Sequence, residues 1–185
     1  MDIRNALKSR KSVRKFQPRE VETEKIGRLL EAATWAPNDR LREPWHFYVI
    51  TGEAKRRYEE LIQQVLEDNV QSTPAAIEQT MQVVRSTPLY IIVTSDVVSG
   101  DEAASKDNEY AVACAIYAMW LAASELGLGM VWRTRGIGLA RDERLYRFIG
   151  APENKTIIGT LCIGYPENEQ APTSRTVFTE KSTWL

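Results

Sequence analysis

The sequence predicts an α+β fold with one central sheet sandwiched between helices, and three observations lead to this prediction. Helical and strand-like segments follow one another in mixed order along the 185 residues. Residues 89–94 and 157–164 are nearly continuous apolar runs, typical of strands buried on both faces. Residues 109–126 are helical in pattern, rich in alanine and apolar all round. Because no repeat or linker interrupts the chain, we expect a single domain over residues 1–185.

Helical signals open the chain. The spacing of the first apolar side chains predicts a helix that ends near Ser9, with Asp2 as a candidate N-cap. A second helix begins at Thr23 and must stop before Pro37, because the residue preceding a proline avoids helical angles. Residues 36–44 are therefore predicted to be a loop.

Strand signals come next. Residues 46–51 are rich in β-branched and aromatic side chains and end at Gly52. Two helical stretches follow, and Pro88 then introduces the apolar run 89–94. This run is expected to be a central strand.

The apolar segment 109–126 is predicted to be a buried helix ended by Gly127 and Gly129. Its small side chains allow close backbone approach, so it could form the middle of the fold or a tight contact with a second subunit. The sequence does not decide between these two alternatives.

The remaining elements are shorter. Residues 130–132 are a short strand candidate, and residues 140–149 form a surface helix that closes at Gly150. Residues 157–164 are the last buried strand, and the tail after Pro166 is expected to be extended.

Composition excludes several classes of protein. The chain has 24 basic and 25 acidic residues and a formal net charge of -1, which argues against a nucleic-acid-binding protein. No secretion segment opens the chain, and no stretch of about 18 apolar residues occurs, so no membrane association is expected. Cys114 and Cys162 lie in apolar sequence without metal-ligand spacing and are read as core residues of a reduced, cytoplasmic protein.

Common catalytic motifs are absent. His46 is the single histidine, and without a nucleophile elbow a serine-hydrolase triad is disfavoured. The motifs of zinc and calcium sites are missing, so no metal is expected. Glycine pairs occur at Gly127 and Gly129 and at Gly136 and Gly138, but each lacks the third glycine of a dinucleotide-binding loop.

The first 19 residues carry seven basic side chains and one acid, Asp2, in an otherwise slightly acidic chain. A solvated helix end would explain this asymmetry. Arg10, Lys11 and Ser12 also place two cations and a hydroxyl within three residues, a set that suits a phosphate monoester. The sequence therefore favours an anion site near its start, with a solvated surface as the alternative.

Three segments resemble FMN-dependent nitroreductases. Residues 9–16 (Ser-Arg-Lys-Ser-Val-Arg-Lys-Phe) are similar to the family's Arg-Arg-Ser-Val-Arg-x-Phe opening. Residues 36–45 (Ala-Pro-Asn-Asp-Arg-Leu-Arg-Glu-Pro-Trp) are similar to Ala-Pro-Ser-x-x-Asn-x-Gln-Pro-Trp. Residues 127–134 (Gly-Leu-Gly-Met-Val-Trp-Arg-Thr) resemble the Gly-x-Gly-x-x-Trp-Arg segment of the compact branch of NAD(P)H nitroreductases. The three matches occur in the family's order and span most of the chain.

The chain departs from the family pattern at three loop positions. Asn38 stands where serine is usual, Leu41 where asparagine often reaches the flavin edge, and Glu43 where glutamine is usual. These departures leave substrate preference open, but they do not touch the basic segment.

The resemblance implies a nitroreductase-like fold, with a mixed, mostly antiparallel sheet flanked by helices. It implies one FMN-binding domain over residues 1–185 and a homodimer with the FMN site at the subunit interface. The residues that it assigns to FMN are Arg10, Lys11, Ser12, Arg14, Trp35, Pro37, Asn38, Asp39, Trp132, Arg133, Thr134 and Arg175.

The basic residues have individual implied roles. Arg10, Lys11 and Ser12 would hold the FMN phosphate and ribityl chain through charge-assisted hydrogen bonds, and Arg175 would add a charge at the phosphate. Arg14 would face the isoalloxazine, where a cation stabilises the anionic reduced flavin. A surface ion pair is the structural alternative for Arg14.

The other assigned residues would surround the ring. Pro37, Asn38 and Asp39 would approach from the second subunit, with Trp35 packed nearby. Residues 132–134 would line the flavin from the sheet side, offering an indole, a positive charge, a hydroxyl and a backbone amide. A core tryptophan beside a surface arginine would explain the last group equally well.

The implied reaction is a ping-pong cycle that moves hydride from NAD(P)H through FMN to an electron-poor small molecule, such as a nitroaromatic or a quinone. Three alternatives remain. One is a specialised flavin reaction, such as reductive dehalogenation or fragmentation of the flavin, although the short loops leave little room for a lid. Another is a flavin carrier or non-catalytic dimeric module. The last, nucleic-acid binding through the basic segment, lacks an aromatic stacking platform.

Overall fold

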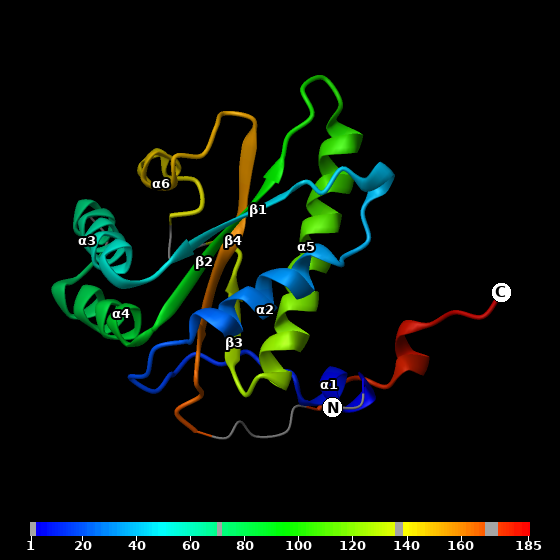
Figure 1. The fold of residues 1–185 in the computed structure, drawn as a ribbon, viewed down its shortest axis with the longest axis horizontal. Helices are drawn as coiled ribbons and strands as arrows, with labels where there is room; N and C mark the ends of the chain where they lie inside the picture. Colours follow the sequence, from blue (N-terminus) through cyan, green and yellow to red (C-terminus); the bar gives the residue numbers. More distant parts are fainter. Residues whose placement is uncertain (1–2, 70–71, 136–138, 169–173) are drawn as a thin grey trace.

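Four strands of the computed structural model form one sheet in the order β1-β2-β4-β3 (Figure 1). They are β1 (Trp45–Ile50), β2 (Leu89–Asp96), β3 (Gly129–Arg133) and β4 (Lys155–Gly164). Each neighbouring pair is antiparallel, and the parallel component among the described residues is an isolated bridge between Ser12 and Met130. The predicted α+β fold is confirmed.

The structure describes residues 3–69, 72–135, 139–168 and 174–185. The expected N-cap Asp2, the glycine pair Gly136 and Gly138, and Thr173 of the tail lie outside these ranges.

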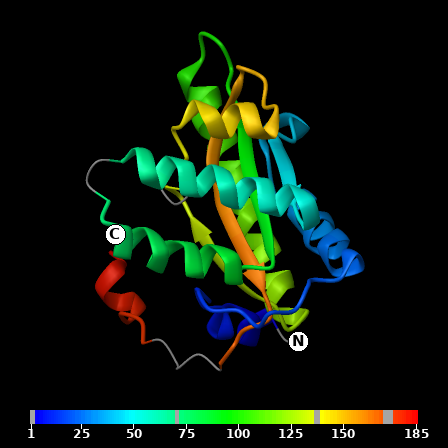
Figure 2. The same cartoon turned by 90° about the vertical axis from the view of Figure 1, so that its left-hand side faces the viewer.

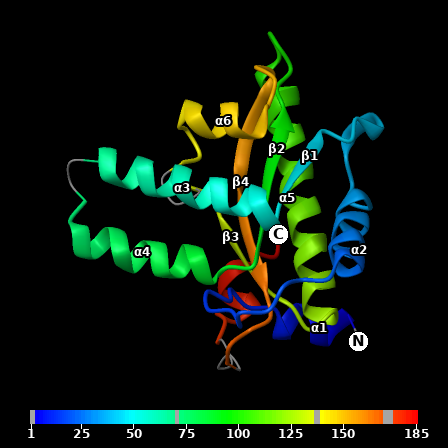
Figure 3. The ribbon, with the colours of Figure 1, turned by 60° about the vertical axis from the view of Figure 1, so that its left-hand side comes forward.

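Helices cover both faces of the sheet, and Figure 3 shows the three resulting layers. On one face lie α2 (Thr23–Thr34) and α5 (Glu102–Glu125). On the other lie α3 (Gly52–Asp68), α4 (Pro74–Ser86) and α6 (Glu143–Ile149), which Figure 2 shows in front of the strands. Each face therefore contributes its own apolar core.

The sheet is built around β2, as its apolar run predicts. Residues 89–95 are buried on both faces, and β2 has a strand on each side. Its pairing with β4 shifts register between Val93 and Thr94, so β4 carries one extra residue there, next to Gly159. The four predicted strands thus form, each within two residues of its expected bounds.

Short elements occupy the ends of the chain. Helix α1 (Ile3–Ser9) is found where it is predicted, and the 3-10 turn η1 (Asp39–Leu41) lies within the expected loop 36–44. Residues 174–185 of the tail are extended apart from a second turn, η3 (Phe178–Lys181), and Figure 1 shows them running away from the layered body. Among the described residues, no helix is both long and apolar enough to cross a membrane.

Helix α5 corrects two predictions. It begins at Glu102, about two turns before the expected residue 109, because Asp101 caps it by accepting a hydrogen bond from the Ala104 amide at 2.9 Å. The helix is also not buried on every side, since Tyr110 is 59% and Tyr117 40% exposed.

The exposed side of α5 also changes the interpretation of the cysteines. Cys114 lies on the same face as Tyr110 and Tyr117 and is exposed, contrary to the prediction of a core residue. Cys162, in β4, is buried as predicted. Tyr110, Cys114 and Tyr117 are called the α5 stripe below.

A polar cluster joins the start of α2 to the end of β4. The Tyr165 hydroxyl donates a hydrogen bond to the Glu22 carboxylate at 2.6 Å, and Lys25 donates to the Tyr165 oxygen at 2.7 Å. Arg19 forms an ion pair with Glu22 at 2.6 Å and stacks 3.9 Å from the Tyr165 ring centroid. The hydrogen bond from Tyr165, assisted by Arg19, lowers the pKa of Glu22 from 4.5 to about 2.

We therefore expect Glu22→Gln to lower the thermal midpoint in a pH-dependent way. A carboxylate whose pKa is depressed in the folded state stabilises the fold above its unfolded pKa, and this contribution is lost as pH falls toward 2. The difference in midpoint between wild type and variant should stay constant from pH 7 to about pH 5 and shrink below that. Because Glu22 is exposed, high salt should reduce the difference at pH 7 as well. A difference that persists unchanged at pH 3 contradicts the assignment.

Candidate functional site

The basic segment, residues 10–14, lies along the free edge of β3. The Val13 amide donates to the Met130 carbonyl at 3.1 Å, and Ser12 forms the parallel bridge with Met130. The side chain of Val13 is buried against Gly129, where an added Cβ would lie 2.6 Å from the Val13 Cβ. The glycine thus permits a close contact that fixes the basic segment on the sheet.

The side chains of the segment point to different sides. Lys11 and Val13 line a hollow of about 550 Å³ near the end of α5. Arg10 instead faces α5, with its guanidinium carbon 4.4 Å from the ring centroid of Trp120. Around the bridge at Ser12 the chain pairs as a strand, so Ser12 and Arg14 lie on the side opposite Val13. The structure therefore separates Lys11, which shares a hollow with Val13, from Ser12 and Arg14, and turns Arg10 toward α5.

The segment keeps its positive charge. Among the described residues, neither the Arg10 nor the Arg14 guanidinium forms an ion pair with a carboxylate, and Arg14 is exposed. The surface ion pair considered for Arg14 is thus not present in the part of the chain that the structure describes. Such cations attract an anion more strongly than paired ones do.

Residues 132–134 continue the same edge of the sheet. Trp132 and Thr134 lie about 7 and 13 Å beyond Met130 along the strand direction, at about 3.3 Å per residue. The Trp132 indole lies across Gly159, where a Cβ would be 2.4 Å from its Nε1, and donates to the Ile158 carbonyl at 3.3 Å. Thr134 is exposed at the end of β3.

Arg133 points to the opposite face of the sheet from Trp132. Its Nε is buried without a hydrogen-bond partner, beside Thr160 in the paired strand. Burial raises the pKa of the neighbouring Cys162 thiol to about 11, although Arg133 opposes this shift. The half-buried Arg133 thus keeps one buried donor, its Nε, without an acceptor among the described residues, and this donor suits an anionic or acceptor group.

The loop at residues 36–44 is held by its own polar contacts. The Asn38 side chain accepts a hydrogen bond from the Glu43 amide at 2.9 Å and donates to the Ala36 carbonyl at 3.3 Å. Asp39 pairs with Arg42 at 2.9 Å. Both polar side chains of the predicted site are therefore used within the loop, where Asn38 takes the place of the usual serine.

Apolar and strained residues mark the surface of this loop. Trp35 and Leu41 are each 83% exposed, and Pro37 is exposed. Arg40, Leu41 and Glu43 have φ of 53°, 53° and 47°, in the left-handed region that non-glycine residues rarely adopt. The chain thus presents a strained loop with large apolar side chains in water.

The loop and the basic segment lie at opposite ends of α5. Arg42 donates to the Asn108 side chain at 3.4 Å near the start of the helix, whereas Trp120 contacts the basic segment near its end. These two positions are separated by about 18 Å along the axis, at about 1.5 Å per residue. One copy of the chain therefore does not bring the two groups of predicted residues together.

Arg175 lies in the exposed tail. The described residues 174–185 run past α1 (Figure 1). A role for Arg175 at the phosphate stays a prediction.

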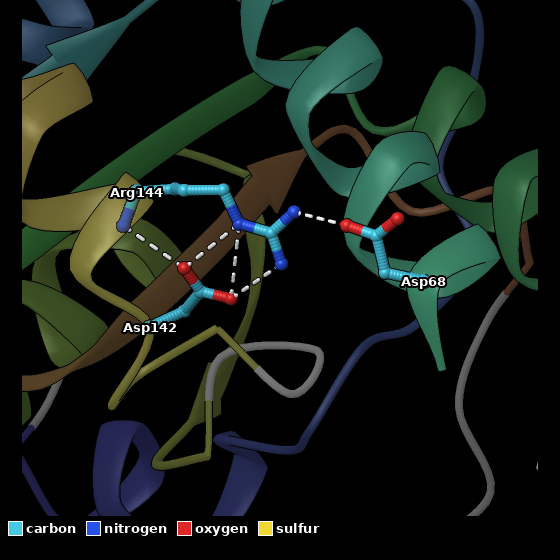
Figure 4. A network of polar contacts seen from close by, with 3 residues as sticks. All are labelled: Asp68, Asp142 and Arg144. Atoms are coloured by element: carbon cyan, nitrogen blue, oxygen red, sulfur yellow. Dashed lines mark hydrogen bonds and ion pairs between the residues drawn. The ribbon is translucent and has the colours of Figure 1, made fainter. Parts of the chain in front are cut away.

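An ion-pair network anchors the start of α6. Arg144 contacts Asp142 through Nε at 3.0 Å and through Nη2 at 2.8 Å, and its Nη1 lies 2.5 Å from Asp68 at the end of α3 (Figure 4). Asp142 also caps α6, and the hydrogen bond from Arg144 lowers its pKa. The network ties α6 to α3 on the side of the sheet where Arg133 points.

Comparison with known proteins agrees with this arrangement. The model of the nitroreductase family matches residues 7–165. The chain belongs to the nitroreductase family. Membership places it among oxidoreductases and accounts for the three motif resemblances, all of which lie within the matched residues.

Individual nitroreductase relatives extend over almost the whole chain. YfhC of Bacillus subtilis, named for a proposed NAD(P)H nitroreductase activity, is 29% identical over 185 residues, which cover 98% of this chain and 93% of YfhC. A crystal structure of a nitroreductase-like family protein from Bacillus cereus superposes with a TM-score of 0.87 at 28% identity, covering 100% and 96% of the two chains. A nitroreductase with bound FMN from Bacteroides fragilis has a TM-score of 0.77 at 23% identity, covers 100% and 99%, and shows the shared fold alone.

Sequence reasoning missed three residues that shape this nitroreductase site. Gly129 admits Val13, Gly159 admits the Trp132 indole, and Trp120 contacts the basic segment. Gly129 was visible as part of a motif, but its contact with Val13 depends on the pairing of two distant segments. Nothing in the local sequence of Gly159 or Trp120 indicates a partner.

We expect Gly129→Ala to loosen the basic segment. The new methyl group would overlap Val13, and overpacking of this kind costs about 1–3 kcal/mol. Urea unfolding should show this loss, and hydrogen exchange should show faster exchange of the Val13 amide. Gly27→Ala is the matched control, because nothing lies within 4 Å of its added Cβ in the middle of α2. The control should gain about 0.5–1 kcal/mol, and equal effects of both substitutions would exclude the contact.

Proposed function

We propose that the chain is an FMN-dependent oxidoreductase that takes electrons from NAD(P)H and passes them to electron-poor small molecules, such as nitroaromatics or quinones. The observation that carries the proposal is the set of three arginines, Arg10, Arg14 and Arg133, arranged around one edge of the sheet without carboxylate partners among the described residues. Family membership supports the redox chemistry. The names of YfhC and of the Bacteroides fragilis structure support the nicotinamide and the flavin, respectively.

The residues present fit the cofactor. Arg10 and Ser12 would hold the phosphate and ribityl chain, and Arg14 and the buried donor of Arg133 would lie toward the ring. FMN bound here would supply two-electron chemistry by accepting a hydride and releasing it to an acceptor. We take residues 1–185 as one FMN-binding domain.

The chain's own residues bind and tune the cofactor. The charges of Arg14 and Arg133 would stabilise negative charge on the ring, which makes its reduction more favourable. Trp132 presents a rigid apolar wall, because its indole is fixed between Gly159 and the Ile158 carbonyl. No side chain is assigned as a general base. Because Arg14 and Thr134 are exposed, the site accepts acceptors of varied shape.

A homodimer completes the site in this proposal. Cys114 lies midway between Asn108 and Trp120 on α5, at the centre of the α5 stripe. A two-fold axis through this point, with the two helices antiparallel, would set the loop of one subunit beside the basic segment of the other. It would also cover Tyr110 and Tyr117. The exposed Trp35 and Pro37 and the half-buried Asn38 would then reach the cofactor held by the second subunit.

We expect the purified protein to carry the visible absorption bands of flavin and to bleach when NADH or NADPH is added without oxygen. Reoxidation by a nitroaromatic or a quinone would complete the cycle. Bound flavin that neither nicotinamide reduces would identify a carrier, and a changed flavin after aerobic turnover would identify a specialised flavin reaction. If FMN does not bind at all, the proposal fails.

Arg10→Gln tests the role of the basic segment in that experiment. Loss of one charge-assisted hydrogen bond, worth about 1.5–3 kcal/mol, should weaken FMN binding by about 10- to 150-fold. Arg57→Gln removes an exposed arginine from α3, remote from β3, and should leave the dissociation constant unchanged. If both variants lose FMN affinity to a similar degree, the effect comes from the overall charge of the protein and not from a specific site at Arg10.

The dimer proposal predicts cross-linking through Cys114. If the two-fold axis passes near this residue, a short bis-maleimide should convert the protein to covalent dimers at low protein concentration. Cys114→Ser should abolish the product, whereas Cys162→Ser should not, because Cys162 is buried. Dimers by sedimentation that resist cross-linking through Cys114 would require another interface.

A further inference from the structure

Trp120 reaches the basic segment with two separate contacts. Its indole Nε1 donates a hydrogen bond to the Lys11 carbonyl at 3.2 Å. The Arg10 guanidinium carbon lies 4.4 Å from its ring centroid, within the range of a cation–π interaction. Trp120 is 8% exposed and belongs to the core between α5 and the sheet. A rigid, buried side chain therefore holds the backbone and one cation of the segment at once.

The hydrogen bond orients the peptide that joins Lys11 to Ser12. The carbonyl and the amide of a trans peptide point in opposite directions. With the Lys11 carbonyl on the indole, the Ser12 amide points away from α5, and it has no hydrogen-bond partner among the described residues. The contact thus presents a free backbone donor next to Ser12's own hydroxyl.

The stacking contact holds Arg10 without neutralising it. A carboxylate partner would fix the guanidinium but cancel its charge, whereas an aromatic face attracts the cation and leaves the charge in place. Tyr117 adds a second ring, whose centroid is 5.9 Å from the same guanidinium carbon. The Arg10 Nε is buried against this aromatic surface.

We propose that Trp120 is a positioning residue for anion binding, which sets the Arg10 guanidinium and the Ser12 amide in the arrangement that holds the FMN phosphate. This inference rests on the proposed flavin function and specifies which part of the cofactor depends on α5. If Trp120 only fills the core, its replacement should weaken the binding of the ring and of the phosphate equally. If Trp120 is a positioning residue, its replacement should weaken the binding of the phosphate alone.

The test compares FMN with riboflavin, which has the same ring system but no phosphate. Dissociation constants for the apoprotein are measured by quenching of flavin fluorescence. Trp120→Phe keeps an aromatic face and loses the hydrogen bond, so FMN should bind about fivefold more weakly. Trp120→Leu loses both contacts, and FMN should bind about thirtyfold more weakly. Riboflavin binding should change by less than about twofold in either variant, so the preference for FMN over riboflavin falls.

Ile116→Val is the matched control for lost packing. Ile116 is fully buried one turn earlier on α5, and its truncation lowers stability without a contact to the basic segment. Both flavins should bind this variant as they bind wild type. If Trp120→Leu does not fold, Trp120→Phe combined with Arg10→Gln, which removes the cation, gives a double-mutant cycle, in which a loss smaller than the product of the two single losses shows that the residues act together.

The outcomes separate this inference from the proposed function. If wild type binds FMN but both Trp120 variants keep its preference over riboflavin, the positioning role is wrong while the flavin function stands. An equal loss of FMN and riboflavin would assign Trp120 to the core alone. If wild type binds neither flavin, the proposed function itself is overturned.

Discussion

The docking of the basic segment on β3 is the contact on which the candidate site depends. Residues 10–14 have no regular structure of their own, so their arrangement comes from the Val13 amide on Met130, the Val13 side chain on Gly129, and Trp120 on the Lys11 carbonyl. Once Val13 is buried, the alternation of the chain decides which neighbours face outward. The positions of the cations therefore follow from the burial of Val13 together with the contacts of Trp120.

This dependence explains how much of the site the sequence could predict. The types of residue were visible, because Arg10, Lys11 and Ser12 place two cations and a hydroxyl within three residues. Their directions were not, because they depend on a pairing between residue 12 and residue 130 that local sequence does not specify. Lys11 shows the consequence, since its charge belongs to the motif while its side chain lines a different hollow.

The fold was also predictable only where the local sequence carries the signal. Strands β2 and β4 were predictable because burial on both faces requires continuous apolar runs, which local sequence displays. The first two turns of α5 were missed because they contain Ser105, Lys106 and Asp107 and have no apolar period, so only the Asp101 cap marks their start. Exposure of Cys114 was missed for another reason. An apolar sequence shows that a helix face can be buried, but it does not show whether the same chain or a second subunit buries it.

A missing second subunit would explain both exposed surfaces, the α5 stripe and the loop at residues 36–44. The α5 stripe and the strained loop at residues 36–44 each cost free energy in an isolated chain, through exposed aromatic area and through left-handed backbone at non-glycine residues. Both lie on the side of the molecule where α5 faces away from the sheet, and η1 contacts α5 directly. An antiparallel partner on α5 would bury the stripe, contact the loop, and bring Asn38 to the basic segment in one step. Association and cofactor binding would then stabilise each other, because both use the same end of α5 where Tyr117 and Trp120 flank Arg10.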